Sequence, residues 1–320
     1  MKTTSMFAGA LLALAASTAW ADSYPSRPVR LVVPYPPGGS ADIVARRIAD
    51  DWAKELGGSV IVDNRAGAGG NIGVDAVAKS PKDGYTIGLQ TVSLAINPSI
   101  FAKMPYDTLK DLTAIGTVAS SQHVLVVNNN FPAKNTRELV AVAKANPGKY
   151  SYGSAGSGST FHMSAELFKA VANVDILHVP YKGGGPALVD TIGGQVDMSF
   201  PVLSAALQQV QSGKLRAIGV TGPKRSALMP DVPTLAESGV PGYSFETWFM
   251  VFAPAGTPQP VIEKLNVSLN KVLNNPALKE RMAKEGIDPT PSTPGEAQAK
   301  LTKEMDMWSK VVKERGIKAE

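Results

Sequence analysis

The feature that most constrains the fold of this chain is an apolar segment that runs, through a glycine-rich loop, into a helix near the N-terminus. Residues 31–33 (LVV) read as a buried strand, and the prolines of segment 34–37 end it because proline has no N–H for a sheet. Gly38 and Gly39 allow backbone conformations that other residues avoid. Apolar residues at helical spacing over 43–52 then predict one buried helix face. The segment therefore predicts a strand–loop–helix unit, the building block of α/β folds.

This first loop has the character of an anion site. Ser40 is predicted to cap the helix, and Asp42 adds negative charge to its first turn. The backbone N–H groups of Gly38 and Gly39 and the positive end of the helix would meet at one place, which suits a carboxylate or a phosphate. Tyr35, which lies between two prolines, could form a wall of that site. The alternative is an ordinary strand–helix connection that is rich in glycine.

Strands and glycine-rich loops continue to alternate after the first helix. Residues 60–62 and 85–89 read as two further buried strands, and segment 64–73 (NRAGAGGNIG) as a second loop that opens a helix. This alternation implies a parallel sheet with right-handed crossovers. Because ligands bind beyond the carboxyl ends of such strands, the loop around Gly38, the loop at 64–73 and residues 91–93 would share one rim.

A second set of such units begins after residue 130. Segment 150–153 reads as a strand, 154–160 (SAGSGST) as a loop of small residues, and 161–172 as a helix. Residues 176–179 form another strand, and residues 183–185 are three glycines before a helix with proline in its first turn. The second half therefore repeats the plan of the first.

Three apolar runs are candidates for crossings between two lobes: 112–118, 123–127 and 248–253. The segments after residue 258 are helical in character and would coat the first lobe. We therefore expect an α/β protein of two lobes, each a mostly parallel sheet flanked by helices, with two crossing strands between them. Lobe 1 would comprise residues 22–122 and 251–320, and lobe 2 residues 123–250.

Missing or scattered residues exclude several chemistries. The chain has no cysteine, which excludes disulfides, thiol catalysis and thiolate metal sites. Its three histidines lie far apart in the sequence and without HExxH spacing, so no metal site is predicted. The net charge of +5 is spread over single Lys and Arg residues, which argues against a nucleic-acid partner. The glycines of 64–73 do not match G-x-G-x-x-G and no P-loop motif occurs, so no nucleotide cofactor is expected.

The first 21 residues have the three parts of a secretory signal. Lys2 supplies the positive charge, residues 6–19 the apolar core, and residues 19–21 (AWA) the cleavage site of small residues. The leader has no twin arginine and no cysteine for a lipid anchor. We expect export by the general secretory (Sec) route with cleavage after Ala21; an uncleaved interfacial anchor is the alternative.

Loop 154–160 also invites comparison with the serine hydrolases. The G-x-S-x-G motif is absent, because Ser157 lacks the flanking glycines. His162 lies on the following helix, but the sequence identifies no acid to orient it. In the alternative interpretation the loop binds an anion: Ser159 or Thr160 caps the helix, and hydroxyl and N–H groups donate to the ligand.

Two such loops, one in each lobe, would together hold a carboxylate with neutral donors and bridging waters. Arg65 and Lys182 lie near the glycine-rich loops and could supply a cation, although surface charges of this kind are usually solvated. This arrangement contains no nucleophile or general base that the sequence can identify. We therefore expect a binding protein and not an enzyme.

Five motifs, taken with the leader, are typical of one family. They are P-Y-P-P-G-G-S-A-D-I-V-A-R (34–46), N-R-x-G-A-G-G-N-I-G (64–73), Y-G-S-A-G-S-G-S-T-x-H (152–162), H-V-P-Y-K-G-G-G-P-A (178–187) and L-M-P-D-V-P-T-L-A-E-S-G (228–239). In this order they make the chain resemble the Bug receptors, the extracytoplasmic solute-binding proteins of tripartite tricarboxylate transporters. The resemblance covers essentially the whole mature chain. It implies a two-lobed Venus-flytrap fold related to type II periplasmic binding proteins, with two crossing strands as the hinge.

The resemblance also implies which residues bind the ligand. A carboxylate would be held by loop 35–40 and loop 154–160, with Thr91 and Ser93 reaching the same ligand and Asp42 organising the first loop. The candidate binding residues are Tyr35, Gly38, Gly39, Ser40, Asp42, Thr91, Ser93, Ser154, Gly156, Ser157, Gly158, Ser159, Thr160, His162 and Lys182.

We therefore predict a monomeric periplasmic receptor, with no cofactor, that closes on a small carboxylated solute and delivers it to the permease subunits of a tripartite transporter. A di- or tricarboxylate, an acidic amino acid or an aromatic acid would suit such a site. A receptor that serves a sensor kinase is one alternative. A secreted hydrolase that uses Ser157 or Ser159 is another, from a different class of protein.

Overall fold

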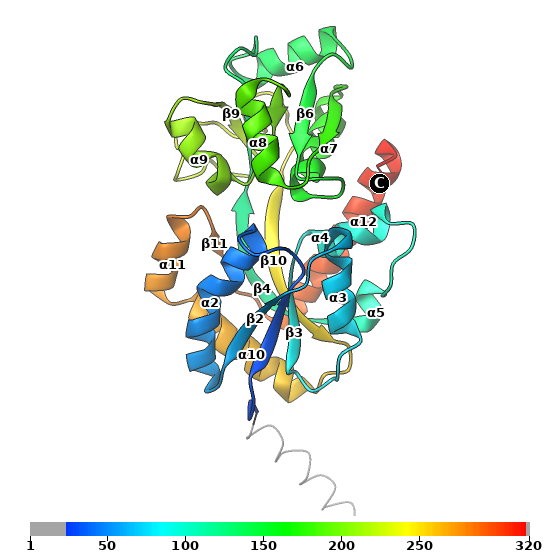
Figure 1. Cartoon of the computed structure of the whole chain (residues 1–320), viewed down its shortest axis with the longest axis vertical. Coiled ribbons are helices and arrows are strands. Elements are labelled where there is room, and N and C mark those ends of the chain that lie inside the picture. Colours follow the sequence, from blue (N-terminus) through cyan, green and yellow to red (C-terminus); the bar gives the residue numbers. More distant parts are fainter. Residues whose placement is uncertain (1–23, 318–320) are drawn as a thin grey trace, which may run out of the picture.

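The computed structural model describes residues 24–317 and shows two α/β bodies, one above the other, with two long strands running between them (Figure 1). The expected leader and its cleavage site lie outside the described residues. None of the helices within residues 24–317 combines the length and the apolar character that crossing a bilayer requires.

The first body is built on a six-stranded sheet in the order β11-β4-β10-β3-β1-β2. Its strands are β1 (Val29–Val33), β2 (Val60–Asn64), β3 (Thr86–Thr91), β4 (Leu112–Gln122), β10 (Glu246–Pro254) and β11 (Asp288–Pro289). β1 pairs in parallel with β2 and β3, as predicted, whereas β10 is antiparallel to both β3 and β4. The sheet is therefore mixed, with four of its six strands running in one direction.

Helices cover both faces of this sheet. They are α2 (Ser40–Leu56), the short η1 (Ala68–Gly70), α3 (Asn71–Ala78), α4 (Ser93–Ile100), α5 (Thr108–Asp111), α10 (Gln259–Leu273), α11 (Pro276–Ala283) and α12 (Pro294–Arg315). On one face α2 packs with α10 and α11 against Leu31 and Val33, and the Trp52 indole N–H donates to Ser268 Oγ at 2.8 Å. On the other face α3, α4 and α12 pack against Val32. The C-terminal helices thus coat the first body.

The second body has a five-stranded sheet in the order β7-β6-β8-β5-β9. Its strands are β5 (Val124–Val127), β6 (Ser151–Ser154), β7 (Leu177–Pro180), β8 (Met198–Ser199) and β9 (Arg216–Val220), and its helices are α6 (Thr136–Ala145), α7 (Thr160–Ala172), α8 (Gly184–Gly193) and α9 (Leu203–Gln211). Only β5 runs against the other four strands. On α7, the predicted helix face of Phe161, Ala165, Phe168 and Ala172 is buried.

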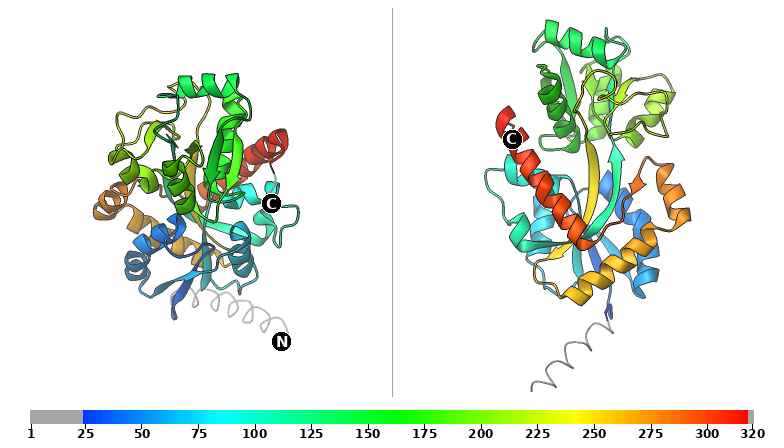
Figure 2. Two further views of the ribbon diagram at one scale, coloured as in Figure 1. Left: turned by 45° about the horizontal axis from the view of Figure 1, so that its top comes forward. Right: turned by 180° about the vertical axis from the view of Figure 1, so that it is seen from behind.

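The two bodies are joined by β4 and β10, which pair with each other from Leu112↔Pro254 to Gln122↔Glu246. His123 separates β4 from β5 and is fully buried; its ring bonds Phe200 O and Thr247 Oγ1 at 2.8 and 2.7 Å. Helix α12 lies alongside these strands and rises toward the second body, where it contacts α7 (Figure 2). The exact residue limits of the two lobes remain a prediction.

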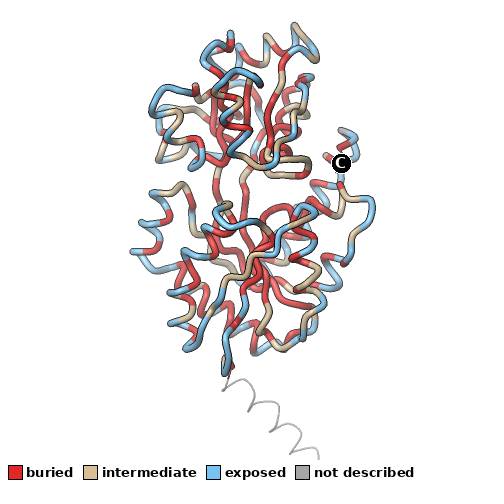
Figure 3. Tube along the Cα trace, viewed as in Figure 1, coloured by how far each residue is buried: buried red, intermediate tan, exposed pale blue. Residues whose placement is uncertain are grey.

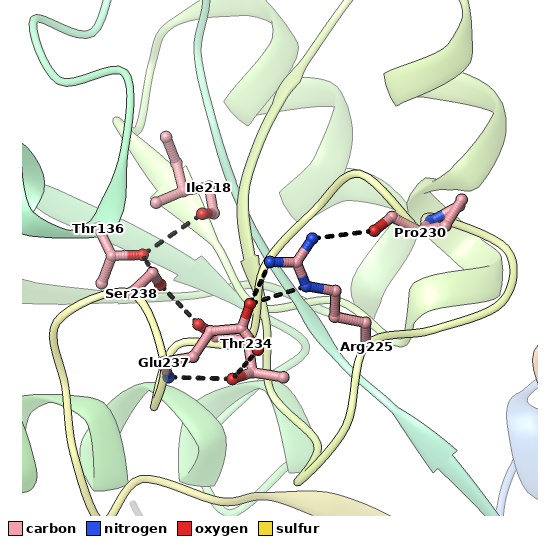
Figure 4. A network of polar contacts seen from close by, with 7 residues as sticks. All are labelled: Thr136, Ile218, Arg225, Pro230, Thr234, Glu237 and Ser238. Carbon is pink, nitrogen blue, oxygen red and sulfur yellow. Dashed lines mark hydrogen bonds and ion pairs between the residues drawn. The ribbon is translucent and has the colours of Figure 1, made fainter.

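The long connection between β9 and β10 contains no helix, and a polar network holds it against the second body (Figure 4). Arg225 pairs with Glu237, whose backbone N–H donates to Thr234 Oγ1 at 3.0 Å. Ser238 Oγ donates to Thr234 O and also bonds Thr136 Oγ1 on α6. The motif at 228–239 thus has a structural role in anchoring the chain before it crosses back.

Several local expectations are wrong. Strand β2 lies at the sheet edge and is half-exposed, not buried (Figure 3). Helices α4 and α9 were not expected from the sequence. The N-cap of α2 is Gly39 without a side-chain bond, and Ser40 is already the first helical residue.

Candidate ligand-binding site

Asp42 organises the loop between β1 and α2. Its carboxylate is nearly fully buried and accepts from Gly38 N at 2.9 Å, from Asn64 Nδ2 at 2.9 Å and from Arg46 Nε at 3.0 Å. Burial alone would raise the pKa of Asp42, but the hydrogen bonds from Arg46, Gly38 and Asn64 outweigh it and hold the pKa below its usual value. Asp42 therefore fixes the loop before the helix and leaves the first N–H groups of the helix uncapped.

These bonds decide which N–H groups of the first loop remain available. Gly38 donates to Asp42, and Gly39 makes a long 3.4 Å contact with Pro36 O. Within residues 24–317, the N–H groups of Ser40 and Ala41 have no acceptor. They are the donors that the start of a helix leaves open, at its positive end. Gly38 is needed for its left-handed φ of +83°.

Three predicted residues meet at the end of β3. The Tyr35 hydroxyl lies 3.1 Å from Thr91 Oγ1, and Thr91 Oγ1 donates to Ser93 Oγ at 3.2 Å. Thr91 N donates to the side-chain oxygen of Gln90 at 2.7 Å. Thr91 and Ser93 are buried, so this row of hydroxyl groups forms a polar layer beneath the first loop.

The second glycine-rich loop, at 64–73, packs tightly against the first. A Cβ at Gly73 would lie 2.7 Å from Pro34 Cβ, and one at Gly70 would lie 2.4 Å from Gln90 Nε2. Asn64, at its start, also donates to Tyr35 O at 3.0 Å. The glycines of this loop therefore permit close packing.

In the second body, the loop 154–160 connects β6 to α7 and is held by side chains from behind. Gly156 N donates to Ser154 Oγ at 3.1 Å, and Ser154 Oγ lies 2.6 Å from His178 Nε2. Gly158 N donates to His162 Nδ1 at 3.0 Å. Ser159 is the N-cap of α7, as one of the two predicted alternatives had it, and accepts from His162 N at 3.3 Å.

The remaining N–H groups of this loop alternate with the occupied ones. Those of Ala155, Ser157 and Thr160 have no acceptor among the described residues. Lys182 is exposed and follows Tyr181, whose N–H donates to Ser154 O at 3.0 Å. Lys182 therefore lies beside this loop, whereas Arg65 pairs with Asp63 at 2.8 Å.

The two bodies come together at this loop. A Cβ on Gly158 would lie 2.7 Å from Ile100 Cδ1, so the loop touches α4, the helix that begins at Ser93. Figure 1 shows the carboxyl ends of β1 and β3 and the start of α2 on the side of the first body that faces the second. The predicted residues of each body therefore gather on facing sides of the molecule.

A hydrolase that used Ser157 or Ser159 would need a histidine ring hydrogen-bonded to that serine. The described residues do not show such a pair. The His162 ring nitrogen Nδ1 accepts from a backbone N–H, and Ser159 Oγ accepts from a backbone N–H. The serine that does touch an imidazole is Ser154, which is fully buried.

Sequence reasoning missed Asn64, Gln90 and His178 as parts of this arrangement. One signal for His178 was present, since residues 176–179 were expected to be a strand following strand 150–153. In the parallel pair that forms, Tyr152 is opposite His178. Asn64 and Gln90 gave no comparable signal, because their roles depend on packing between loops.

No group of three or more acidic or histidine side chains placed to hold a metal ion occurs within residues 24–317.

Comparison with known proteins finds a family match over most of the chain. Residues 44–317 match the family described as "Tripartite tricarboxylate transporter family receptor". Three solved structures are similar over their whole length. The Rhodopseudomonas palustris protein Rpa4515, solved with adipate, is 36% identical with a TM-score of 0.85 and covers 93% of this chain and 100% of its own.

The periplasmic binding protein BugD is also 36% identical, with a TM-score of 0.82 and coverage of 93% of this chain and 100% of its own. MatC from Rhodopseudomonas palustris, solved with bound malate, is 31% identical, with a TM-score of 0.79 and coverage of 90% and 100%. These likenesses confirm the expected two-lobed periplasmic binding fold.

Proposed function

This chain belongs to the tripartite tricarboxylate transporter receptor family, and we propose from that premise that it binds a small carboxylated solute between its two lobes. In this proposal it acts in the periplasm, as a monomer, and delivers the solute to membrane permease subunits. It is a binding protein and carries out no catalysis.

One observation carries the proposal: each body presents a loop whose open N–H groups stand at the start of a helix. In the first body these belong to Ser40 and Ala41, and in the second to Thr160, with the open N–H of Ser157 two residues before the N-cap of α7. Segments 34–40 and 154–160 contain no charged residue. Neutral N–H donors at the positive ends of two helices suit a carboxylate, which can accept from both sides.

The candidate residues then take different roles. Ser40, Ser157 and Thr160 would donate to the carboxylate through backbone N–H groups. The glycines Gly38, Gly39, Gly156 and Gly158 would set the loop shapes, and Thr91 and Ser93 would support the first loop through Tyr35. Lys182, beside the second loop, would add a positive charge at the rim.

Relatives support the ligand class. Adipate and malate, the acids bound in the two Rhodopseudomonas palustris structures, are both dicarboxylates. We propose that a dicarboxylate of similar size binds this chain, with one carboxylate held by the two loops.

A thermal-shift screen of the mature protein tests this. The panel contains mono-, di- and tricarboxylates, including adipate, malate and citrate, with the fully methylated esters as matched controls. An acid at ~100 times its dissociation constant should add ~2.7 kcal/mol of stability, and its ester should add none. Shifts with sugars or amides, and none with any acid, would contradict the proposal.

A further inference from the structure

Three aromatic rings are stacked behind loop 154–160. The imidazoles of His162 on α7 and His178 on β7 lie 4.1 Å apart and 12° from parallel. The ring of Tyr152 on β6 stacks on His178 at 4.9 Å. Of these, His162 and Tyr152 are buried, so the stack is part of the interior and its rings have little freedom to turn.

Each imidazole reaches a different point of the loop. His162 Nδ1 accepts from Gly158 N at 3.0 Å, and His178 Nε2 lies 2.6 Å from Ser154 Oγ, which in turn accepts from Gly156 N. Two of the loop's N–H groups are thereby held inward. The N–H groups of Ala155 and Ser157, which alternate with them along the chain, have no acceptor among the described residues.

The hydrogen bond from Gly158 fixes the protonation state of His162. An imidazole nitrogen that accepts a hydrogen bond carries no proton, so the ring must be neutral with its proton on Nε2. The surroundings support this state, since burial, His178 and Lys169 lower the pKa of His162 to about 3. The ionisable side chains close to the stack are Glu166, which accepts from Tyr152 OH at 2.6 Å, and Lys169, which pairs with Glu166 at 2.8 Å.

The loop needs such a restraint because of its own composition. Gly156 and Gly158 have φ angles of +111° and +76°. Glycine can adopt these angles, but it adopts negative φ angles about as readily. Without an acceptor for Gly158, this stretch would have many backbone conformations to choose from.

We propose that His162 is a positioning residue, which holds loop 154–160 in its binding shape through Gly158 and does not itself touch the carboxylate. The inference rests on the proposed function and gives His162 a role other than that of a ligand contact. The free donors of Ala155 and Ser157 keep their geometry because their neighbours are tied down.

Two variants of His162 separate this role from simple packing. In His162→Asn the side-chain oxygen Oδ1 occupies the place of Nδ1 and can still accept from Gly158. In His162→Leu the volume is similar but the acceptor is gone. Ser164→Ala is the matched control, because Ser164 lies on the same helix, is fully buried and bonds Tyr243 OH at 2.8 Å, away from the loop.

The four proteins are titrated with adipate, malate and citrate, and the exchange of the Gly158 amide proton is measured by NMR without any acid. We expect His162→Leu to bind about tenfold more weakly and to lose protection at Gly158. His162→Asn should recover both, and Ser164→Ala should bind as the wild type does even if it is less stable.

Wild-type affinity in His162→Leu would overturn the inference about His162 and leave the proposed function standing. Equal losses in His162→Asn and His162→Leu, with protection of Gly158 unchanged, would show that the ring acts only by packing and would also overturn it. A wild-type protein that binds none of the three acids nor any other member of the carboxylate panel would instead contradict the proposed function.

Discussion

Neighbouring glycines have different roles in the first loop. Gly38 has a left-handed φ and a committed N–H, whereas Gly39 has φ −75° and ψ 165°, a conformation open to any residue. A Cβ on Gly39 would meet only Pro36 O, at 3.5 Å. The fold therefore does not require glycine at position 39, so a substitution there can test whether a ligand approaches the loop closely.

This difference gives a prediction for Gly39→Val. The branched side chain should block access to the N–H groups of Ser40 and Ala41, weakening carboxylate binding by about tenfold or more, with little change in unfolding free energy. Titration calorimetry and urea unfolding measure the two effects. Gly38→Ala is the comparison: its positive φ should cost about 1–2 kcal/mol of stability. Unchanged affinity in Gly39→Val would remove the first loop from the site.

Ser159 gives a second prediction at this scale, because it is both a candidate binding residue and the N-cap of α7. Ser159→Ala should lower the unfolding free energy by about 1 kcal/mol through loss of the cap. It should also weaken carboxylate binding by about 1–3 kcal/mol if the Ser159 hydroxyl hydrogen-bonds the ligand. Thr293→Ala removes the corresponding cap of α12, which accepts from Glu296 N, far from the loop. If Ser159→Ala and Thr293→Ala bind equally well, the Ser159 hydroxyl acts only as a cap.

At the scale of elements, Asp42 joins three parts of the chain: the loop after β1, helix α2 and the end of β2. Asp42→Asn should destabilise the protein by about 1–3 kcal/mol at pH 7, because an amide cannot accept all three hydrogen bonds.

The effect depends on pH in a definite direction. The folded-state pKa of Asp42 is depressed, so its stabilisation is present above the ordinary carboxyl pKa of about 4 and is lost as the pH falls through the folded value. Urea unfolding of wild type and Asp42→Asn at several pH values checks this. The gap between them should be constant above about pH 5 and narrow below pH 4; a gap that widens in acid would contradict it.

The same scale shows how far sequence reasoning reaches. Continuous apolar runs located β1 and β10, which are buried on nearly all of their residues, and helical periodicity located α2 and α7, each of which buries an apolar face. Sequence reasoning missed α4, which contains Pro98 and is buried around nearly all of its circumference, so that no polar face marks it as a helix. It expected a buried β2 because Val60, Ile61 and Val62 are apolar, but strand order, not composition, decides which strand lies at the edge.

The two glycine-rich loops were located correctly as segments between a strand and a helix, but the use of each atom within them was not predictable. A sequence shows that glycines are present, and it does not show that Gly38 donates to Asp42 or Gly158 to His162. Each pairing joins a loop glycine to a side chain four residues later in the first turn of a helix, so it depends on the exact backbone path of the loop, which no residue pattern specifies.

At the scale of the whole molecule, two buried histidines couple stability to pH. Burial lowers the pKa of His123 to about 4, and burial with His178 and Lys169 lowers that of His162 to about 3, below the ordinary value near 6.5. Below about pH 6.5 these histidines become protonated in the unfolded chain but stay neutral in the folded chain. The free energy of unfolding should therefore fall toward acid by up to about 1.4 kcal/mol per pH unit for each histidine.

Urea unfolding between pH 7.5 and 5 measures this slope. His162→Asn and His123→Gln should each flatten it, and the double variant should flatten it most. Equal stability at pH 7.5 and pH 5 in the wild type would mean that these rings become protonated without unfolding.

The paired strands β4 and β10 have a consequence for how the molecule can move. They pair with each other from Leu112↔Pro254 to Gln122↔Glu246, with two irregularities in the register, so sliding of one strand along the other would break their hydrogen bonds. We therefore expect the two bodies to rotate about this pair of strands and not to slide along it. A pair of spectroscopic labels, one on each body and away from the two strands, should follow that rotation.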